Sequence, residues 1–440
     1  MTRLNALATR LLLVGALIGR VAAGDDAIEF IPLDDLKLSS TLQVKWCWNA
    51  TGIDAQDRVY AVYGGPWGDL TDCAVFRYDA RTGNKEFLGT AIETLKAAEN
   101  YHEGERVEKG HTHLPFLDGK IFIGTQGFHF ASGANSPGMR DALNSRGAHI
   151  LGYDTQAERL FDLSRHEPAG VFFDQRGFIA LTVMPSQNLL IGLTVPQGDL
   201  LLYDVSKDRV LSKVAGVPSA LGTTRISREV VAARNSKIYW MYGPLKPSDG
   251  PGQMYVYDLN SGQRNSEPIA VDPWCWNGQA IAPSDGSVYL SDQPGHLYRL
   301  DTNSDRLETL GRLVPEAELA NEGNAMMRFS PPVVQGIYLS TDEKRIYAIA
   351  SREMTPLPPV IQENGKPKRF REPIALYAFD LGSREVREVH RFPRWNTFCY
   401  VTGSNVKDTE GNLYFAVHAG KKGLMKVNVE ELRTQQKDID

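Results

Sequence analysis

Three histidines of one short segment have the spacing that most directly suggests chemistry. His111 and His113 lie in Gly110-His111-Thr112-His113, and His129 follows after a Gly-rich turn. Alternate residues of a β-strand share a face, so the first two point the same way. Such a group permits general base catalysis near neutral pH or binding of a divalent metal ion. Histidines that only hydrogen-bond backbone carbonyls remain an alternative, above all for His149, and no acidic fourth metal ligand is evident.

Arginines and aromatic residues form a second group, because they stand at or near the start of several segments that are expected to be inner strands. Guanidinium groups bind carboxylate or sulfate through paired hydrogen bonds, and aromatic rings stack on rings of a ligand. The group therefore favours an anionic, ring-bearing ligand, although each arginine taken singly can be structural. Its members, with the histidine already named, are Trp48, His111, Arg176, Arg225, Arg228, Trp276, Asn277, Arg328 and Tyr400.

A repeated phrase indicates the elements that position these residues. Phe76-Arg77-Tyr78-Asp79 precedes a polar turn, and phrases like it end at Asp154, Asp204, Asp258, Asp301, Asp380 and, in weaker form, Asn428. Each reads as a strand with alternating apolar residues that closes in a hairpin turn. Repeats of short strands at intervals of roughly 40–80 residues predict a β-propeller. We expect an all-β fold of seven four-stranded antiparallel blades.

Each blade is expected to run as strands A to D from the central channel outward. The boundaries are residues 45–89, 111–161, 177–214, 225–269, 276–313, 328–392 and 399–429. The last blade has only three strands of its own, so the strand at Ala27–Leu33 is expected to supply the fourth. Closure of this kind removes the exposed sheet edges of an open ring.

Loop lengths predict which face of the ring is functional. The A–B and C–D turns are short, whereas the long connections are B–C or D–A loops, which lie on the same face of an up-and-down blade. Function is expected at this loop-rich face, where the inner strands begin. Ala91–Glu103 has helical spacing and predicts a short helix over the face. Arg352–Glu372 is Pro-rich and basic, which is consistent with a mobile flap, although a solvated loop with incidental charge is the more favoured alternative.

The chain as a whole is predicted to be one exported domain. Residues 1–23 read as a secretory signal, with Arg3 and Arg10 before a short apolar run, and residues 24–440 as one propeller. We therefore expect a secreted or periplasmic protein, a monomer, with no membrane segment after cleavage. A net charge of −5 gives no general attraction to nucleic acid. Cys47, Cys73, Cys275 and Cys399 allow three disulfide pairings, while the repeated context of three of them suggests buried thiols.

The repeated strands and turns resemble the seven-bladed propellers of the TolB-like, quinoprotein-like and lactonase type, with a repeat of the WD40-like kind. A narrower similarity is to the propeller polysaccharide lyases that act on oligogalacturonate and ulvan. That resemblance implies paired channel histidines at His111 or His113 with His129, a carboxylate-neutralising arginine at Arg225 or Arg228, and a tyrosine at Tyr400 or Tyr242. No GxSxG elbow, P-loop or strand-linked GxGxxG motif occurs in the sequence.

The leading hypothesis is a secreted enzyme that cleaves a uronate-containing polysaccharide or oligosaccharide by β-elimination. Catalysis is assigned to His113, His129, Arg228 and Tyr400, and substrate binding to the other members of the second group. The alternatives are a non-catalytic propeller that binds a glycan or a protein, and a lactonase or hydrolase with a divalent metal at His111, His113 and His129. The cofactor and the polymer are left open.

Overall fold

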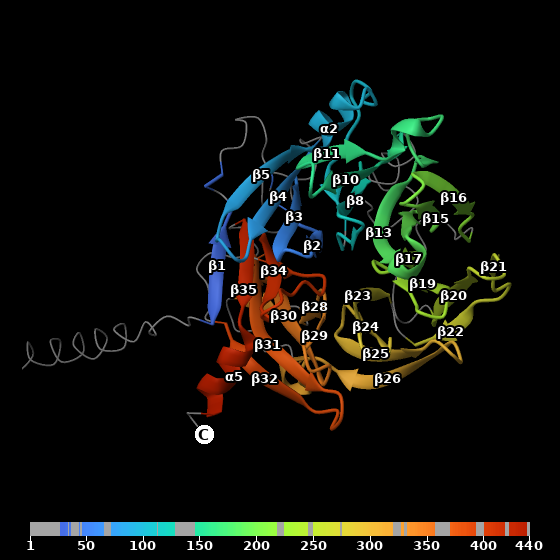
Figure 1. The fold of residues 1–440 in the computed structure, drawn as a ribbon. Helices are drawn as coiled ribbons and strands as arrows, with labels where there is room; N and C mark the ends of the chain where they lie inside the picture. Colours follow the sequence, from blue (N-terminus) through green and yellow to red (C-terminus); the bar gives the residue numbers. More distant parts are fainter. Residues whose placement is uncertain are drawn as a thin grey trace, which may run out of the picture.

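The fold is a ring of β-sheets around a central channel (Figure 1). The computed structural model describes residues 27–33, 35–36, 44, 46–65, 72–111, 113–127, 146–217, 224–244, 250–272, 275–319, 327–329, 332–356, 370–392, 400–418 and 422–437. Residues 1–23, for which a signal was predicted, lie outside this part. The ring confirms the predicted all-β class and the seven antiparallel blades.

The first four blades follow one another in chain order. Blade one contains β2 (Thr51–Ile53), β3 (Arg58–Gly64), β4 (Cys73–Asp79) and β5 (Lys85–Thr90). Blade two contains β6 (Lys109–Gly110), β7 (Phe116–Leu117), β8 (Lys120–Gln126), β10 (Ile150–Asp154) and β11 (Arg159–Asp162), and the short β9 (Gly147–Ala148) pairs with β12 (Phe173–Asp174). Blade three contains β13 (Gly177–Met184), β14 (Leu189–Val195), β15 (Leu200–Asp204) and β16 (Arg209–Val214). Blade four contains β17 (Thr224–Ile226), β18 (Val231–Ala232), β19 (Lys237–Pro244), β20 (Gly252–Asp258), β21 (Gln263–Arg264) and β22 (Ile269–Val271).

The last three blades complete the ring. Blade five contains β23 (Trp276–Ile281), β24 (Val288–Asp292), β25 (His296–Asp301) and β26 (Arg306–Arg312). Blade six contains β27 (Met327–Phe329), β28 (Val333–Val334), β29 (Tyr338–Leu339), β30 (Arg345–Pro356), β31 (Phe370–Asp380) and β32 (Val386–Arg391). Blade seven contains β33 (Tyr400–Thr402), β34 (Leu413–His418), β35 (Gly423–Val427) and β1 (Ile28–Pro32). The helices are α2 (Ala91–Ala97), α4 (Glu316–Leu319), α5 (Val429–Lys437) and the 3-10 turns η1 (Ser164–His166) and η2 (Pro185–Gln187).

The ring closes through its N-terminal strand, as predicted. β1 pairs antiparallel with β35 from Ile28 opposite Val427 to Pro32 opposite Gly423, and the two strands lie side by side in Figure 1. Lys85 of blade one ties this strand down, because its Nζ donates to the carbonyl of Pro32 (2.9 Å). None of the helices in the described residues is long and apolar enough to cross a membrane.

The repeated aspartates act as turn residues on the short-turn face. Asp79 Oδ1 accepts hydrogen bonds from the backbone N–H groups of Arg81 (2.9 Å) and Thr82 (3.1 Å). Such an aspartate fixes a tight turn by replacing a backbone acceptor. Asp154, Asp258 and Asp380 likewise accept from two backbone N–H groups of their turns, and Asp204 and Asp301 each accept from one.

Two predictions for the loop-rich face need correction. The helix expected at residues 91–103 exists as α2, but it packs on the outer strands β5 and β11 at the rim of the ring and not over the channel. The predicted flap at 352–372 is partly strand, because antiparallel pairing continues to Arg352 opposite Glu372 and Met354 opposite Phe370. Residues 357–369 lie outside the described part.

Candidate functional site

Aromatic and basic side chains meet where blades seven, one and two reach the loop-rich face. The rings of Trp46 and Trp48 stack with centroids 5.7 Å apart, and Trp46 meets the ring of His418 edge-on at 5.3 Å. The Nζ of Lys109 lies 5.0 Å from the centroid of Trp48. We call Trp46, Trp48, Lys109 and His418 the mouth cluster. An indole face with a cation over it is a surface on which an anionic sugar ring can stack and pair its charge.

Close approach of the inner strands builds this cluster. Trp48 forms a parallel bridge with His111, and Trp46 an antiparallel bridge with Gly64. A Cβ on Gly64 would lie 2.0 Å from the carbonyl oxygen of Glu108, and one on Gly52 would lie 2.2 Å from that of Leu114. Only glycine lets the backbones of blades one and two come this close. The stacked tryptophans are therefore held at a fixed distance from Lys109.

Lys109 is a buried cation whose proton is weakly held. Its side chain belongs to a residue only 6% exposed. Burial lowers the pKa of Lys109 to about 7; Glu108 opposes this shift, and the positive charge of Arg228 adds to it. Glu108 is itself bound by Arg106. Lys109 and Arg228 come from blades two and four, so charges on two different blades act on each other.

Blade four contributes the second basic wall of the mouth. Arg225 and Arg228 flank the end of β17, and the backbone N–H of Arg228 donates to the carbonyl of Trp276 in blade five (2.9 Å). Burial lowers the pKa of Arg225, which the Cys275 thiol partly opposes. Burial also raises the pKa of the Cys275 thiol to about 12. The thiol is therefore protonated at neutral pH and adds no negative charge to this wall.

One buried carboxyl group lies beside these arginines. Glu229 is 2% exposed, and burial raises its pKa to about 8, against the opposing influence of Gln279 and Arg228. Gln279 acts here as a hydrogen-bond donor to the carboxylate, while its Oε1 atom has no hydrogen-bond partner among the described residues. A protonated Glu229 is a neutral donor at this place, so below about pH 8 the wall keeps its positive charge.

His113 reaches across the channel wall to blade seven. The residue as a whole is half-buried, but its imidazole bonds with the backbone of Ser404, and burial of the ring lowers its pKa to about 4. The imidazole is neutral at physiological pH and can accept a proton.

Several of the predicted binding residues have structural partners. Arg176 pairs with Asp199 (Nε to Oδ2, 2.9 Å). Trp276 is fully buried and packs in the core between blades four and five. The Nδ2 of Asn277 donates to the carbonyl of Val334 (3.1 Å) and joins blades five and six. Such contacts favour structural roles, and we leave these three residues out of the ligand site.

Other predicted residues cannot be placed. His129 and Cys399 lie outside the described residues, as do the side chains of Arg328 and Tyr400. Among the described residues, no three His, Cys, Asp or Glu side chains are grouped to hold a metal ion. The proposed histidine metal site therefore depends on His129. Cys47, Cys73 and Cys275 are free thiols, and the first two are buried.

His149 belongs to a buried polar network away from the channel. Its Nε2 lies 2.9 Å from Glu105 Oε1 and its Nδ1 2.7 Å from Ser164 Oγ, and Ser164 donates to Asp162 (2.6 Å). Burial alone would lower the pKa of His149, but the carboxylates of Asp162 and Glu105 raise it above its usual value. The network joins the connection between blades one and two to blade two, through side-chain partners and not through the backbone carbonyls that the structural alternative expected.

Buried amides line the inner strands near the mouth. In the described part of the chain, neither side-chain polar atom of Asn49 or Gln126 has a hydrogen-bond partner, although the two residues are 0% and 1% exposed. Unpaired buried amides cost free energy unless water or a ligand binds them. Asn49 also begins the sequence Asn49-Ala50-Thr51, and its complete burial keeps this sequon out of reach in the folded protein.

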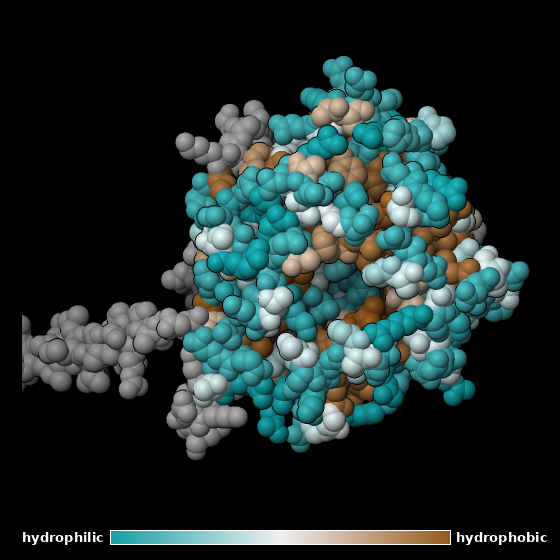
Figure 2. Space-filling model, in the orientation of Figure 1, coloured by the Kyte–Doolittle hydropathy of each residue, from teal (hydrophilic) through white to brown (hydrophobic). Residues whose placement is uncertain are grey.

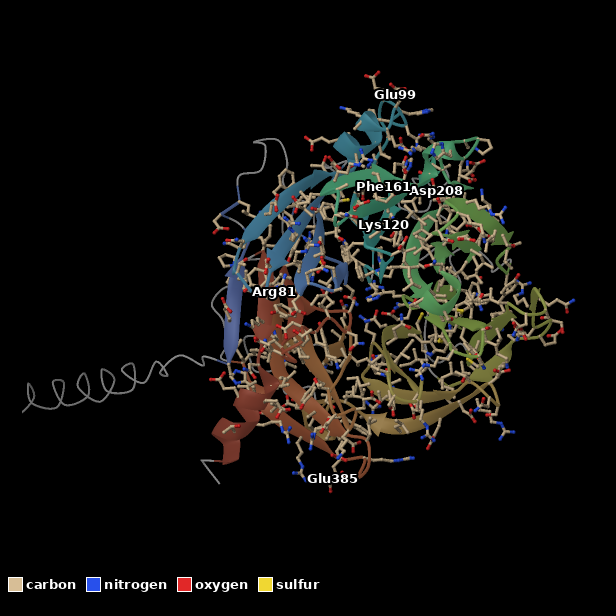
Figure 3. The ribbon with its side chains drawn as sticks, in the orientation of Figure 1. Arg81, Glu99, Lys120, Phe161, Asp208 and Glu385 are labelled. Atoms are coloured by element: carbon tan, nitrogen blue, oxygen red, sulfur yellow. The ribbon has the colours of Figure 1, made fainter. Side chains whose placement is uncertain are left out.

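The face seen in Figure 2 is hollowed near its centre, whereas a separate pocket lies on the outer rim. That pocket, of about 510 Å³, lies between blades two and three, where Figure 3 labels Lys120, Phe161 and Asp208. Its lining carries both signs of charge, and Asp208 already accepts a hydrogen bond from Tyr203. This mixture of charges gives the pocket no preference for an anion.

Comparisons with known proteins identify the fold alone. No family model and no curated protein matches the chain. Similar solved structures include RRP9 WD40 repeats (10% identity, TM-score 0.53, 91% of this chain and 99% of that one) and U3-55K (10%, 0.51, 91% and 98%). A chain of a mitotic checkpoint complex also matches (11%, 0.50, 92% and 94%). This chain shares their propeller fold. No such comparison supports the resemblance to polysaccharide lyases.

Sequence reasoning missed Lys109 and His418. Lys109 stands two residues before His111, so strand alternation already placed the two on one side of the blade. His418 lies opposite Tyr400 in the register of β33 and β34, a relation that becomes visible only once the last blade is paired.

Proposed function

We propose that the protein binds an anionic saccharide of the uronate-containing class at the loop-rich mouth of the channel. The observation that carries this proposal is the Trp48–Lys109 pair facing Arg228. Three features support it. Trp48 offers a ring for stacking, and the positive charges of Lys109 and Arg228 act on each other. The pKa of Lys109 is lowered, so that an anion bound nearby would stabilise its protonated form. The free energy lost by burying these charges is recovered when a carboxylate enters. Such a ligand also suits the export that residues 1–23 predict.

Binding variants test the proposal. Trp48→Ala and Arg228→Gln should each weaken binding of a galacturonate oligomer by about 10–100-fold, since each removes a stacked ring or a charge-assisted contact. Arg81, labelled in Figure 3, is exposed at a turn of the opposite face, so Arg81→Gln is the matched control and should bind like the wild type. Equal affinities for all four proteins in calorimetry would refute the proposal.

A second candidate is cleavage of the bound saccharide by β-elimination, favoured by the neutral imidazole of His113. In that reaction Arg228 neutralises the uronate carboxylate and His113 takes the C5 proton. The C4–O bond breaks, and Tyr400, predicted as the second catalytic group, gives a proton to the leaving oxygen. The product contains a C4–C5 double bond and absorbs in the ultraviolet. An absorbance rise that His113→Gln abolishes would support the enzyme; a flat trace with intact binding would leave a binding protein.

A further inference from the structure

Two blades of the ring pair a buried tyrosine of strand B with an aspartate of the preceding A–B turn. In blade one the hydroxyl of Tyr60 donates to Asp54 Oδ2 (2.9 Å), and in blade seven that of Tyr414 donates to Asp408 Oδ2 (2.8 Å). The Oδ1 atom of each aspartate accepts from backbone N–H groups of its own turn. Each aspartate therefore uses both of its oxygens, one for the turn and one for the tyrosine.

Blade six has the same tyrosine but a serine in place of the aspartate. Ser340 opens its A–B turn, because its backbone N–H donates to the carbonyl of Arg345 (2.9 Å), as the N–H of each aspartate does across its own turn. Tyr347 stands two residues after Arg345, the place of the tyrosine in the other two blades. The single side-chain oxygen of Ser340 is taken by the turn, since it accepts from the N–H groups of Lys344 (3.1 Å) and Arg345 (3.0 Å).

The hydroxyl of Tyr347 is consequently left without the partner that the other blades supply. The residue is fully buried, and within the described part of the chain its hydroxyl has no hydrogen-bond partner. A buried donor in this state costs free energy until an acceptor reaches it. Burial also raises the pKa of Tyr347, so the hydroxyl keeps its proton at neutral pH. The acceptor found at this position in blades one and seven is a carboxylate oxygen.

Tyr347 lines a cavity of about 460 Å³ between blade six, blade seven and the C-terminal helix. The turns that begin at Ser340 and at Lys407 form two of its sides, and α5 contributes Glu430 and Arg433. α5 packs on β32, the outer strand of blade six (Figure 1). A cavity of this size admits a small organic molecule. It lies at the short A–B turns, on the face of the ring opposite the channel mouth.

The carboxylates around this cavity are already engaged or exposed. Glu430 pairs with Arg433 (3.0 Å) on the helix, and Asp342 pairs with Arg345 (3.2 Å) in the turn of blade six. Glu410 is exposed at the edge of the cavity. These ion pairs leave little charge of either sign on the helix and on the turn of blade six.

Lys407 is the cation of the lining that has no ion pair with a described residue. It is half-buried, and its Nζ donates to the carbonyl of Leu339 (3.0 Å). An ammonium group has three N–H donors, so this bond leaves donors for a ligand. Water screens a half-buried charge less than an exposed one, which strengthens its attraction for an anion. The cavity therefore offers a neutral hydroxyl donor from blade six and a positive charge from blade seven.

We propose that this cavity binds a small organic carboxylate, whose oxygen occupies the position at Tyr347 that an aspartate fills in blades one and seven. The ammonium group of Lys407 supplies the opposite charge. Because the two donors come from neighbouring blades, the ligand joins blade six to blade seven and stabilises the ring. This site lies apart from the channel mouth and does not depend on the function proposed there.

Thermal unfolding of the full mature chain in acetate tests the site, because acetate reproduces the carboxylate end of an aspartate side chain. At about pH 7 and equal ionic strength, about 100 mM sodium acetate should raise the Tm of the wild type by about 1–3 °C relative to sodium chloride, since a ligand that binds only the folded state stabilises it. Acetamide has nearly the same shape without the charge and should give no such rise.

Variants assign the effect to the cavity. Tyr347→Phe should melt like the wild type in chloride, because no bond to a described residue is lost, and should not respond to acetate. Tyr60→Phe is the matched control: it loses the bond to Asp54 and should melt at a lower temperature in chloride, but it should keep the full acetate rise. Lys407→Gln should reduce the rise. Ser340→Asp supplies a carboxylate from the chain itself and should abolish it.

Three results would overturn the site. The first is a wild type that acetate stabilises no more than chloride or acetamide does. The second is an equal acetate rise in the wild type and in Tyr347→Phe, which would be a general effect of the salt. The third is a Tyr347→Phe variant that melts well below the wild type in chloride, which would show that the hydroxyl serves the fold. The comparison of acetate with acetamide uses the wild type alone, so it decides the matter even where Ser340→Asp fails to fold.

Discussion

Lys109 is a cation in surroundings that favour a neutral group. A lysine whose pKa is depressed on folding binds fewer protons in the folded state, so it destabilises the fold at neutral pH. Residues that cost stability in this way are characteristic of binding sites, where the ligand later supplies the missing partner. The mouth cluster therefore lowers the stability of the free protein, and we expect ligand binding to offset this loss.

Lys109→Met should stabilise the fold and weaken ligand binding. At pH 7 we expect the free energy of unfolding to rise by about 1–3 kcal/mol, because an apolar chain replaces a desolvated charge. The folded lysine titrates near pH 7 and the unfolded one near pH 10, so wild-type stability gains with pH between these values and the difference shrinks there. Denaturant unfolding at several pH values measures it. A variant less stable than the wild type at pH 7 would contradict this account.

Gly52 tests the close approach that positions the tryptophans. A Cβ at this residue would lie 2.2 Å from the carbonyl oxygen of Leu114, so Gly52→Ala must push blades one and two apart. We expect a loss of about 1–3 kcal/mol in the free energy of unfolding. Gly382→Ala is the control, because Gly382 also lacks a positive φ and the only atom near its new Cβ is Asp380 Oδ1, at 3.3 Å. Equal losses in the two variants would argue against crowding at Gly52.

At the scale of elements, the His149 network ties the connection after α2 to blade two. Its histidine has a raised pKa and its carboxylates Glu105 and Asp162 have lowered ones. The histidine contribution is complete below about pH 6.5 and is lost as the pH rises through the raised value, and the carboxylate contribution is lost in acid below about pH 4. His149→Gln should therefore lower the melting temperature most between about pH 4.5 and pH 6.5. A difference that is constant from pH 4 to pH 9 would contradict the charged network.

The sequence was sufficient to predict elements but not the contacts between blades. Each strand and each Asp turn has a local signal, such as Asp79 with its polar turn, so the blades were predictable along the whole chain. Arg176, in contrast, was assigned to a ligand because nothing local shows its pairing with Asp199, which lies in the turn between β14 and β15. Trp276 was likewise assigned to a sugar ring, although packing between two blades buries it. Lys109 was missed because only the assembled ring brings it to Trp48 and Arg228.

At the scale of the whole molecule, stability depends on closing the ring. β1 covers the edge of β35, and Ile31 and Leu33 join the core of the neighbouring blade. A chain that starts at residue 34 should lose several kcal/mol and aggregate through the open edge. A chain that starts at Ala27 keeps β1 and should behave like the longer protein. Thermal unfolding and light scattering compare the two, and equal stability would contradict closure by β1.

The most direct test of the central claim is a comparison of two ligands that differ only in charge. Binding of a galacturonate oligomer and of its methyl ester is measured by calorimetry at about pH 6, where Lys109 is protonated. The account predicts that the free acid binds at least about tenfold more tightly, because only its carboxylates pair with Lys109 and Arg228. Equal affinity of the two ligands, or tighter binding of the ester, would show that the channel mouth is not an anion site.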